Sequence, residues 1–151
     1  MRRLLSVAVL GLGITAAVAG AASANEYYGH QKVVYHVNGE GGDKDRSYMM
    51  ALTNVQNQIN AVGKDNIEVK VVLHGDGLDL LKDARDNMAL QSKVIALKEQ
   101  KVQFLVCNNT LVGRHMDANR DLYDVEKEDI VPSGVAELSR LQMKGYTYIR
   151  P

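Results

Sequence analysis

The chain contains a single cysteine, and its setting suggests reactivity. Cys107 follows the apolar residues 104–106 and precedes the polar residues 108–110. If a helix begins just after it, backbone N–H groups lower the thiol pKa below its ordinary value of about 8.5 and favour the nucleophilic thiolate. The alternative is a buried cysteine that acts as a small hydrophobic residue.

Two histidines end apolar runs in the same way. His36 ends "VVYH" and His74 ends "VVLH", much as Cys107 ends "FLVC". If these runs are neighbouring parallel strands, their carboxyl ends meet at the edge of the sheet where open α/β proteins bind ligands. The predicted site has Cys107 as its catalytic residue and the following binding residues: His36, His74, Asp76, Asn108, Asn109 and Thr110.

A soft metal such as copper or zinc is a second possible ligand for His36, His74 and Cys107. These side chains come from three separate runs, and their spacing along the chain matches no metal motif. We therefore expect neither a metal nor another cofactor. Binding of a small ligand or a soft metal remains the alternative to thiol chemistry.

The elements that position these residues alternate between strands and helices. Strands are predicted at residues 32–37, 67–74 and 102–107, within 128–134, and at 146–150. Helices are predicted at residues 43–62 and 80–99, within 108–116, and at 133–145. The second and third strands are almost continuously apolar, which is typical of a parallel sheet covered on both faces. The predicted fold class is a three-layer α/β/α domain with a mainly parallel five-stranded sheet.

The first 24 residues have the order of a secretory signal peptide. Two arginines precede an apolar run that is shorter than the roughly 20 residues of a spanning helix. Residues 22–24, "ASA", then form a small-residue cleavage site. We expect cleavage after Ala24, a mature single domain at residues 25–151, and a periplasmic location with no membrane span.

Charge and cysteine content limit the possible partners. The whole chain has 18 basic and 18 acidic residues, and cleavage would remove only Arg2 and Arg3. The small negative charge that remains gives no reason to expect nucleic acid as a partner. One cysteine cannot form an intrachain disulfide, and an odd thiol in an exported protein indicates a reactive group or an intermolecular bridge.

Three stretches together resemble the DsrE/DsrF-like family of small sulfur-relay proteins. They are "VVLHGDGLDLL", "FLVCNNTL" and "VPSGVAELSRLQMKGYTYIRP". The resemblance implies a five-stranded α/β/α domain of flavodoxin-like topology that forms homo-oligomers, often trimers or hexamers. It also implies that Cys107 carries sulfane sulfur as a persulfide.

Two hypotheses follow from these observations. In the first, a periplasmic protein accepts, holds or passes sulfane sulfur on Cys107, and its partner is a sulfur donor or acceptor protein or a small sulfur compound. His74 or Asp76 orients the site, and backbone N–H groups stabilise the thiolate. In the second, the same crevice is a non-catalytic binding site that does not need the nucleophilicity of Cys107.

Overall fold

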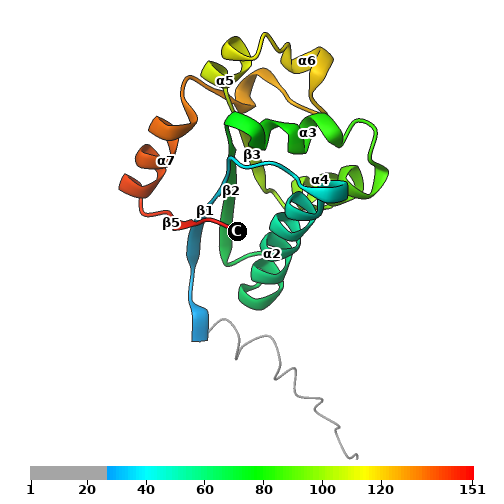
Figure 1. Cartoon of the computed structure of the whole chain (residues 1–151). Helices are drawn as coiled ribbons and strands as arrows, with labels where there is room; N and C mark the ends of the chain where they lie inside the picture. The colour runs from blue at the N-terminus through cyan, green and yellow to red at the C-terminus, as the bar shows by residue number, and fades with distance from the viewer. Residues whose placement is uncertain (1–26) are drawn as a thin grey trace, which may run out of the picture.

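The protein folds into a five-stranded sheet with helices on both faces (Figure 1). The structure, a computed structural model, describes residues 27–151, so the predicted signal peptide lies outside the described residues. Among residues 27–151, no helix combines the length and apolar character needed to cross a bilayer.

The strands are β1 (Gln31–Val37), β2 (Ile67–Leu73), β3 (Gln103–Cys107), β4 (Ile130–Val131) and β5 (Thr147–Ile149). The helices are α2 (Arg46–Val62), α3 (Asp79–Asp83), α4 (Met88–Glu99), α5 (Asn108–Gly113), α6 (Ala118–Asp121) and α7 (Gly134–Met143), with short 3₁₀ turns η1 (Asp43–Asp45), η2 (Gly75–Leu78) and η3 (Lys127–Asp129).

The strand order explains which helices cover which face. The order is β4-β3-β2-β1-β5, and every pairing is parallel. The chain therefore moves in one direction from β1 to β4 and then returns across the whole sheet to β5. Because parallel crossovers are almost always right-handed, the returning helix must lie on the opposite face. Figure 1 shows this arrangement, with α7 on one side of the sheet and α2, α3 and α4 on the other.

The predicted three-layer α/β/α class with a parallel five-stranded sheet is confirmed. The strand order corrects the expected flavodoxin-like topology. Flavodoxin has the order 2-1-3-4-5, which places β1 between β2 and β3. Here β1 lies between β2 and β5, because α2 and the α3–α4 segment carry the chain in the same direction.

One predicted helix is interrupted. The expected helix at residues 80–99 is two helices, α3 and α4, with a turn between them. The side chain of Asn87 caps α4 by accepting hydrogen bonds from the backbone N–H groups of Ala89 and Leu90. An asparagine that satisfies the free donors of a new helix favours a fresh start at this point.

The alternation of side chains along the strands assigns the predicted site to one face. Val33, Tyr35 and Val37 belong to the large core under α2, α3 and α4. The second core, on the α7 face, contains one central residue from each of the three central strands: Val34, Val72 and Leu105. Successive strand residues point to opposite faces. His36, His74 and Cys107 each follow their strand's member of the second core by two residues, so all three share the α7 face.

A close backbone contact fixes the loop after β2. A Cβ atom on Gly77 would lie 2.1 Å from the carbonyl oxygen of Val37, so only glycine fits. The backbone N–H of His74 also donates to the Val37 carbonyl, at 3.3 Å. The end of β2 is thereby held against the end of β1, and His74 is held beside His36.

Candidate functional site

Cys107 ends β3 and occupies the position immediately before α5. The sequence predicted this junction. The thiol sulfur is surrounded by hydrogen-bond donors: the Thr110 hydroxyl and the backbone N–H groups of Asn109, Thr110 and Gly134. Burial by itself raises the pKa of Cys107, but these hydrogen bonds outweigh burial and lower it below the ordinary value. The site therefore favours a thiolate.

Cys107 is almost completely buried. The residue is only 4% exposed. The next two residues, Asn108 and Asn109, are both exposed, so the buried cysteine lies close to the surface in the chain. Reagents that reach the sulfur from this side must therefore be small.

The start of α7 forms the other wall of the cysteine site. Ser133 caps α7, and its hydroxyl accepts a hydrogen bond from the backbone N–H of Ala136. A Cβ atom on Gly134 would lie 3.2 Å from the Cβ of Cys107 and 3.0 Å from the Cβ of His74. Glycine at this position lets the helix N-terminus approach both residues, and its backbone N–H reaches the sulfur.

Two histidines and a tyrosine form a hydrogen-bonded chain on the same face. The Nε2 atoms of His36 and His74 are 2.6 Å apart, and the Nδ1 of His36 is 2.6 Å from the hydroxyl oxygen of Tyr148. The two imidazole rings stack with centroids 4.7 Å apart. The chain thus crosses three adjacent strands, from β5 through β1 to β2.

Both imidazoles favour the neutral form. Burial lowers the pKa of His36 to about 4, with smaller contributions from the neighbouring His74 and from the Arg150 guanidinium. Burial also lowers the pKa of His74. At neutral pH the site therefore has no imidazolium beside Cys107, and the donors around the sulfur favour the thiolate without an ion pair.

The other predicted site residues have different outcomes. Thr110 is at the site, and its hydroxyl oxygen also accepts from the backbone N–H of Gly75 at 3.0 Å. Asn109 contributes its backbone N–H, whereas Asn108 is not among the donors to the sulfur.

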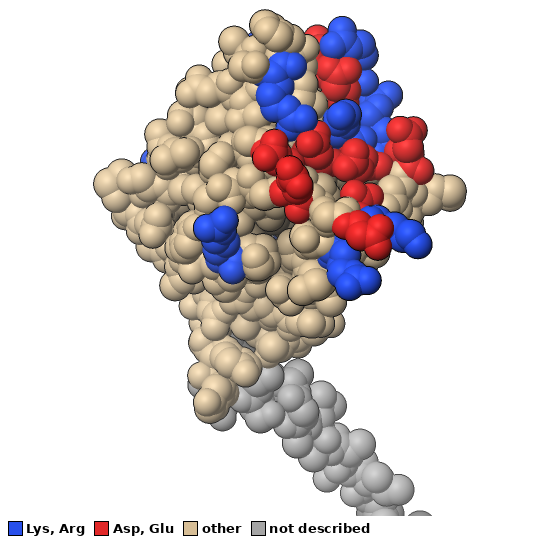
Figure 2. Space-filling model, in the orientation of Figure 1, with Lys and Arg blue, Asp and Glu red and all other residues tan. Residues whose placement is uncertain are grey.

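Asp76 belongs to a different group of side chains. It is exposed, and its backbone carbonyl accepts a hydrogen bond from the Tyr48 hydroxyl at 2.7 Å. Burial raises the pKa of Tyr48, and the nearby carboxylates of Asp79, Asp83, Asp76 and Asp45 raise it further. Figure 2 shows acidic side chains gathered on the side of the molecule where α3 lies in Figure 1. Asp76 is therefore not an orienting group for Cys107.

Sequence reasoning missed two members of the site. The terminal strand predicted at residues 146–150 contained Tyr148, but nothing in the sequence paired that strand with β1. Gly134 stood in the "PSG" motif at the beginning of the helix predicted at residues 133–145, where it resembles an ordinary helix start. The available signal for a close approach at Gly134 was its position directly after a helix-capping serine, in the helix that carries the chain back across the sheet.

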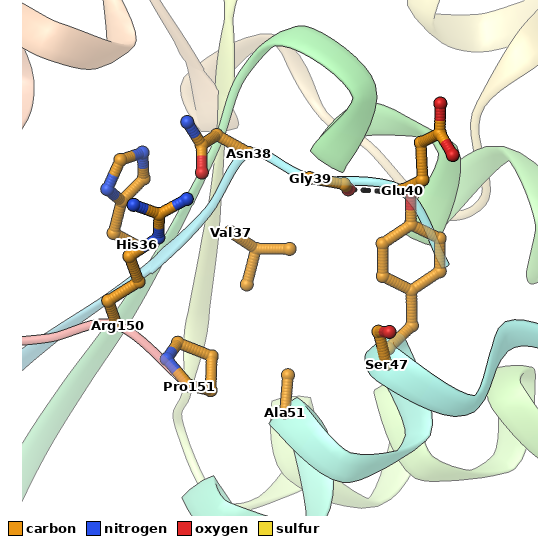
Figure 3. A pocket seen from close by; sticks show the side chains of 10 residues that line it. His36, Val37, Asn38, Gly39, Glu40, Ser47, Ala51, Arg150 and Pro151 are labelled. Atoms are coloured by element: carbon orange, nitrogen blue, oxygen red, sulfur yellow. Dashed lines mark hydrogen bonds between the residues drawn. The ribbon is translucent and has the colours of Figure 1, made fainter. Parts of the chain in front are cut away.

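A small cavity adjoins His36 on the side away from Cys107. It has a volume of about 210 Å³ and lies between the carboxyl ends of β1 and β5 and the start of α2. Figure 3 shows Arg150 beside His36 and Asn38, with Ser47 and Ala51 on the opposite wall. This is the position where the strand order reverses, at which open α/β sheets commonly bind ligands. His36 is the residue shared by this cavity and the histidine–tyrosine chain.

The two histidines are poorly arranged for a metal ion. Residues 27–151 contain no group of three or more His, Cys, Asp or Glu side chains placed to hold one. Zinc needs nitrogen ligands at about 2.0–2.1 Å that converge on the ion. Two Nε2 atoms 2.6 Å apart face each other and share a proton. The geometry of the two histidines favours a proton between them over a bound metal ion.

Comparison with known proteins gives the family. A family model described as the DsrE/DsrF-like family matches residues 31–151. The chain belongs to the DsrE/DsrF-like family. A solved structure with a similar fold is that of a protein of unknown function, MTH1491, from Methanobacterium thermoautotrophicum. It shares 33% sequence identity and a TM-score of 0.66, and the match covers 80% of this chain and 99% of that one. A comparison with curated proteins gives no match.

The hydroxyl of Thr110 provides a first test of the site in this DsrE/DsrF-like chain. Thr110→Val removes one donor to the sulfur, and a hydrogen bond to a charged group contributes about 1.5–3 kcal/mol. We expect the pKa of Cys107 to rise and iodoacetamide alkylation near neutral pH to slow about tenfold. Thr110→Ser should restore the rate. Thr147→Val, a matched change on the exposed edge strand, should alkylate like wild type; equal slowing in both valine variants would contradict the assignment.

The histidine pair predicts a loss of stability in acid. Unfolded histidines take up protons near pH 6.5, but His36 in the folded chain does so only near a pKa of about 4. The unfolded state therefore binds more protons between these values, so stability is complete above the window and falls as pH is lowered through it. Urea denaturation near neutral pH and at about pH 5 should show a smaller acid loss for His36→Gln than for wild type.

His30→Gln is the control for the acid measurement, because His30 is exposed and lies outside the chain of hydrogen bonds. It should lose stability in acid as wild type does. If His36→Gln shows the same pH dependence as wild type, the low proton affinity of His36 is not a property of the folded protein.

Proposed function

We propose that this protein carries sulfane sulfur as a persulfide on Cys107. Membership of the DsrE/DsrF-like family connects the chain with sulfur relay at the level of the family. The observation that supports the proposal for this chain is the set of four donors around the Cys107 sulfur. Three are backbone N–H groups, which cannot titrate. They stabilise a thiolate before the reaction and a sulfur anion after it.

The proposed loading step exchanges one sulfur–sulfur bond for another. The Cys107 thiolate attacks the outer, sulfane sulfur of a donor persulfide, R–S–S⁻. A bond forms between the Cys107 sulfur and the sulfane sulfur, and the donor's own S–S bond breaks. The electron pair leaves on the donor as the thiolate R–S⁻, so the number of negative charges is unchanged. Transfer to an acceptor thiolate is the reverse of this exchange.

The burial of Cys107 supports a particular class of donor. A side chain only 4% exposed excludes a bulky group from direct contact with the sulfur in this conformation. Small polysulfides and low-molecular-weight persulfides fit the restriction. A donor protein would have to insert an extended tip past Asn108 and Asn109, or displace the start of α5.

Mass spectrometry of the native protein after exposure to inorganic polysulfide tests the proposal. Wild type should gain the mass of one or more sulfur atoms, and treatment with a reducing thiol should remove it. Cys107→Ser should gain none while keeping the wild-type circular dichroism spectrum, because the substitution is nearly isosteric. A wild-type protein that gains sulfur only after denaturation would show that Cys107 is a core residue, which favours the alternative of a non-catalytic ligand-binding module.

We also propose that the protein is exported to the periplasm and forms a homo-oligomer, a trimer or hexamer. The signal-like residues 1–24 support export. The edge position of β5 supports assembly, since an exposed sheet edge tends to be paired. The protein extracted from the cell envelope should begin at Asn25 by intact mass, and sedimentation at micromolar concentration should give a multiple of the chain mass. An uncleaved chain contradicts the first proposal, and a monomer contradicts the second.

A further inference from the structure

The histidine–tyrosine chain ends next to Cys107. His74 and Cys107 directly follow the paired residues Leu73 and Val106 on adjacent parallel strands, which lie about 4.8 Å apart. Both side chains also pack against Gly134. The hydrogen-bonded chain therefore starts at Tyr148, on the edge strand, and ends at His74, the neighbour of Cys107 on the adjacent strand.

The two hydrogen bonds of the chain permit only ordered proton arrangements. A neutral imidazole has one N–H group and one acceptor nitrogen. If the Tyr148 hydroxyl donates to Nδ1 of His36, then Nε2 of His36 donates to Nε2 of His74, and His74 holds its own proton on Nδ1. In the other arrangement every donor is reversed. One proton leaving His74 and one entering at Tyr148 convert the first arrangement into the second.

We propose that His74 protonates the sulfur that leaves when the Cys107 thiolate attacks a sulfur–sulfur bond, and that His36 and Tyr148 resupply this proton. His74 is then a catalytic residue, and His36 and Tyr148 are positioning residues that act through it. The inference rests on the proposed nucleophilic role of Cys107 and extends it to the leaving group. Tyr148 and His36 have no other hydrogen-bonded partner on this face within the described residues.

The step balances with a disulfide or neutral polysulfide, R–S–S–R′, as the substrate. The thiolate of Cys107 bonds to the first sulfur, the S–S bond breaks, and the electron pair leaves on R′–S⁻. That thiolate takes the Nδ1 proton of His74. His74 then accepts a proton on Nε2 from His36, His36 accepts one on Nδ1 from Tyr148, and Tyr148 accepts one from water. The net consumption is one proton from solvent, and all three side chains end neutral.

The surroundings of His36 disfavour a protonated imidazolium, so the ring is suited to passing a proton on and not to holding an extra one. Arg150 lies beside the ring and disfavours a second positive charge there. The ring also borders the cavity between β1 and β5 (Figure 3), and Tyr148 is 43% exposed, so water can reach this end of the chain. The cysteine end has no comparable opening, since Cys107 is 4% exposed.

The dependence of rate on the leaving group separates this role from a structural one. A thiol of low pKa leaves readily without a proton, whereas an alkyl thiolate leaves slowly. Cys107 is treated with dithiodipyridine, which has a good leaving group, and with bis(2-hydroxyethyl) disulfide, which has a poor one. The measured quantity is the rate with bis(2-hydroxyethyl) disulfide divided by the rate with dithiodipyridine. Direct removal of a general acid costs at least about a hundredfold in rate. Tyr148 and His36 act only through His74, so Tyr148→Phe and His36→Gln should each lower this ratio by less, about tenfold.

Tyr28→Phe and His30→Gln are the matched controls, because both residues are exposed and neither contacts the chain. Their ratios should equal that of wild type. If Tyr148→Phe and His36→Gln slow both disulfides equally, their role is structural and the relay is wrong. If neither variant changes the ratio while the native protein still gains sulfur from polysulfide, the relay fails and the sulfur-carrier proposal stands. A native thiol that reacts with neither disulfide overturns the relay, and one that also gains no sulfur from inorganic polysulfide overturns both proposals.

Discussion

The arrangement of the site depends on one close contact, the approach of the α7 N-terminus to the ends of β2 and β3. Gly134 leaves room for the Cβ atoms of both Cys107 and His74, and its backbone N–H completes the donors around the sulfur. A larger residue would push α7 away from the sheet and remove that donor. The right-handed return of the chain from β4 to β5 puts α7 on this face, where the contact can form.

Local sequence patterns predicted most of the fold but not the strand order. The apolar runs ending at His36, His74 and Cys107 were sufficient to predict three parallel strands with a shared edge. Their order depends on the direction in which each crossover turns, which no local pattern contains. The interruption between α3 and α4 was missed because a hydrophobic period continues through Asn87, whose capping role appears only when Ala89 and Leu90 supply their N–H groups.

The candidate site was predicted only in part, because some of its contacts depend on the complete topology. Cys107, His36 and His74 were placed together from strand ends alone, and Thr110 from its position after the cysteine. Asp76 was misplaced because a residue two positions beyond a strand can turn toward either face, and η2 turns it toward Tyr48. Tyr148 is 112 residues from its partner His36, and a contact of that range follows only from the complete topology.

The return of the chain to β5 has a consequence for when the thiol becomes active. Gly134 and Tyr148 both belong to the segment that follows β4, and each contacts a residue far earlier in the chain. A polypeptide that has formed only β1 to β4 has the cysteine at the end of a strand but lacks the α7 donor and the tyrosine. Its thiol would be less acidic than in the finished fold. The topology thus withholds full reactivity from an incomplete or unfolded chain, so the thiol of a lone cysteine is less prone to oxidation before the fold is complete.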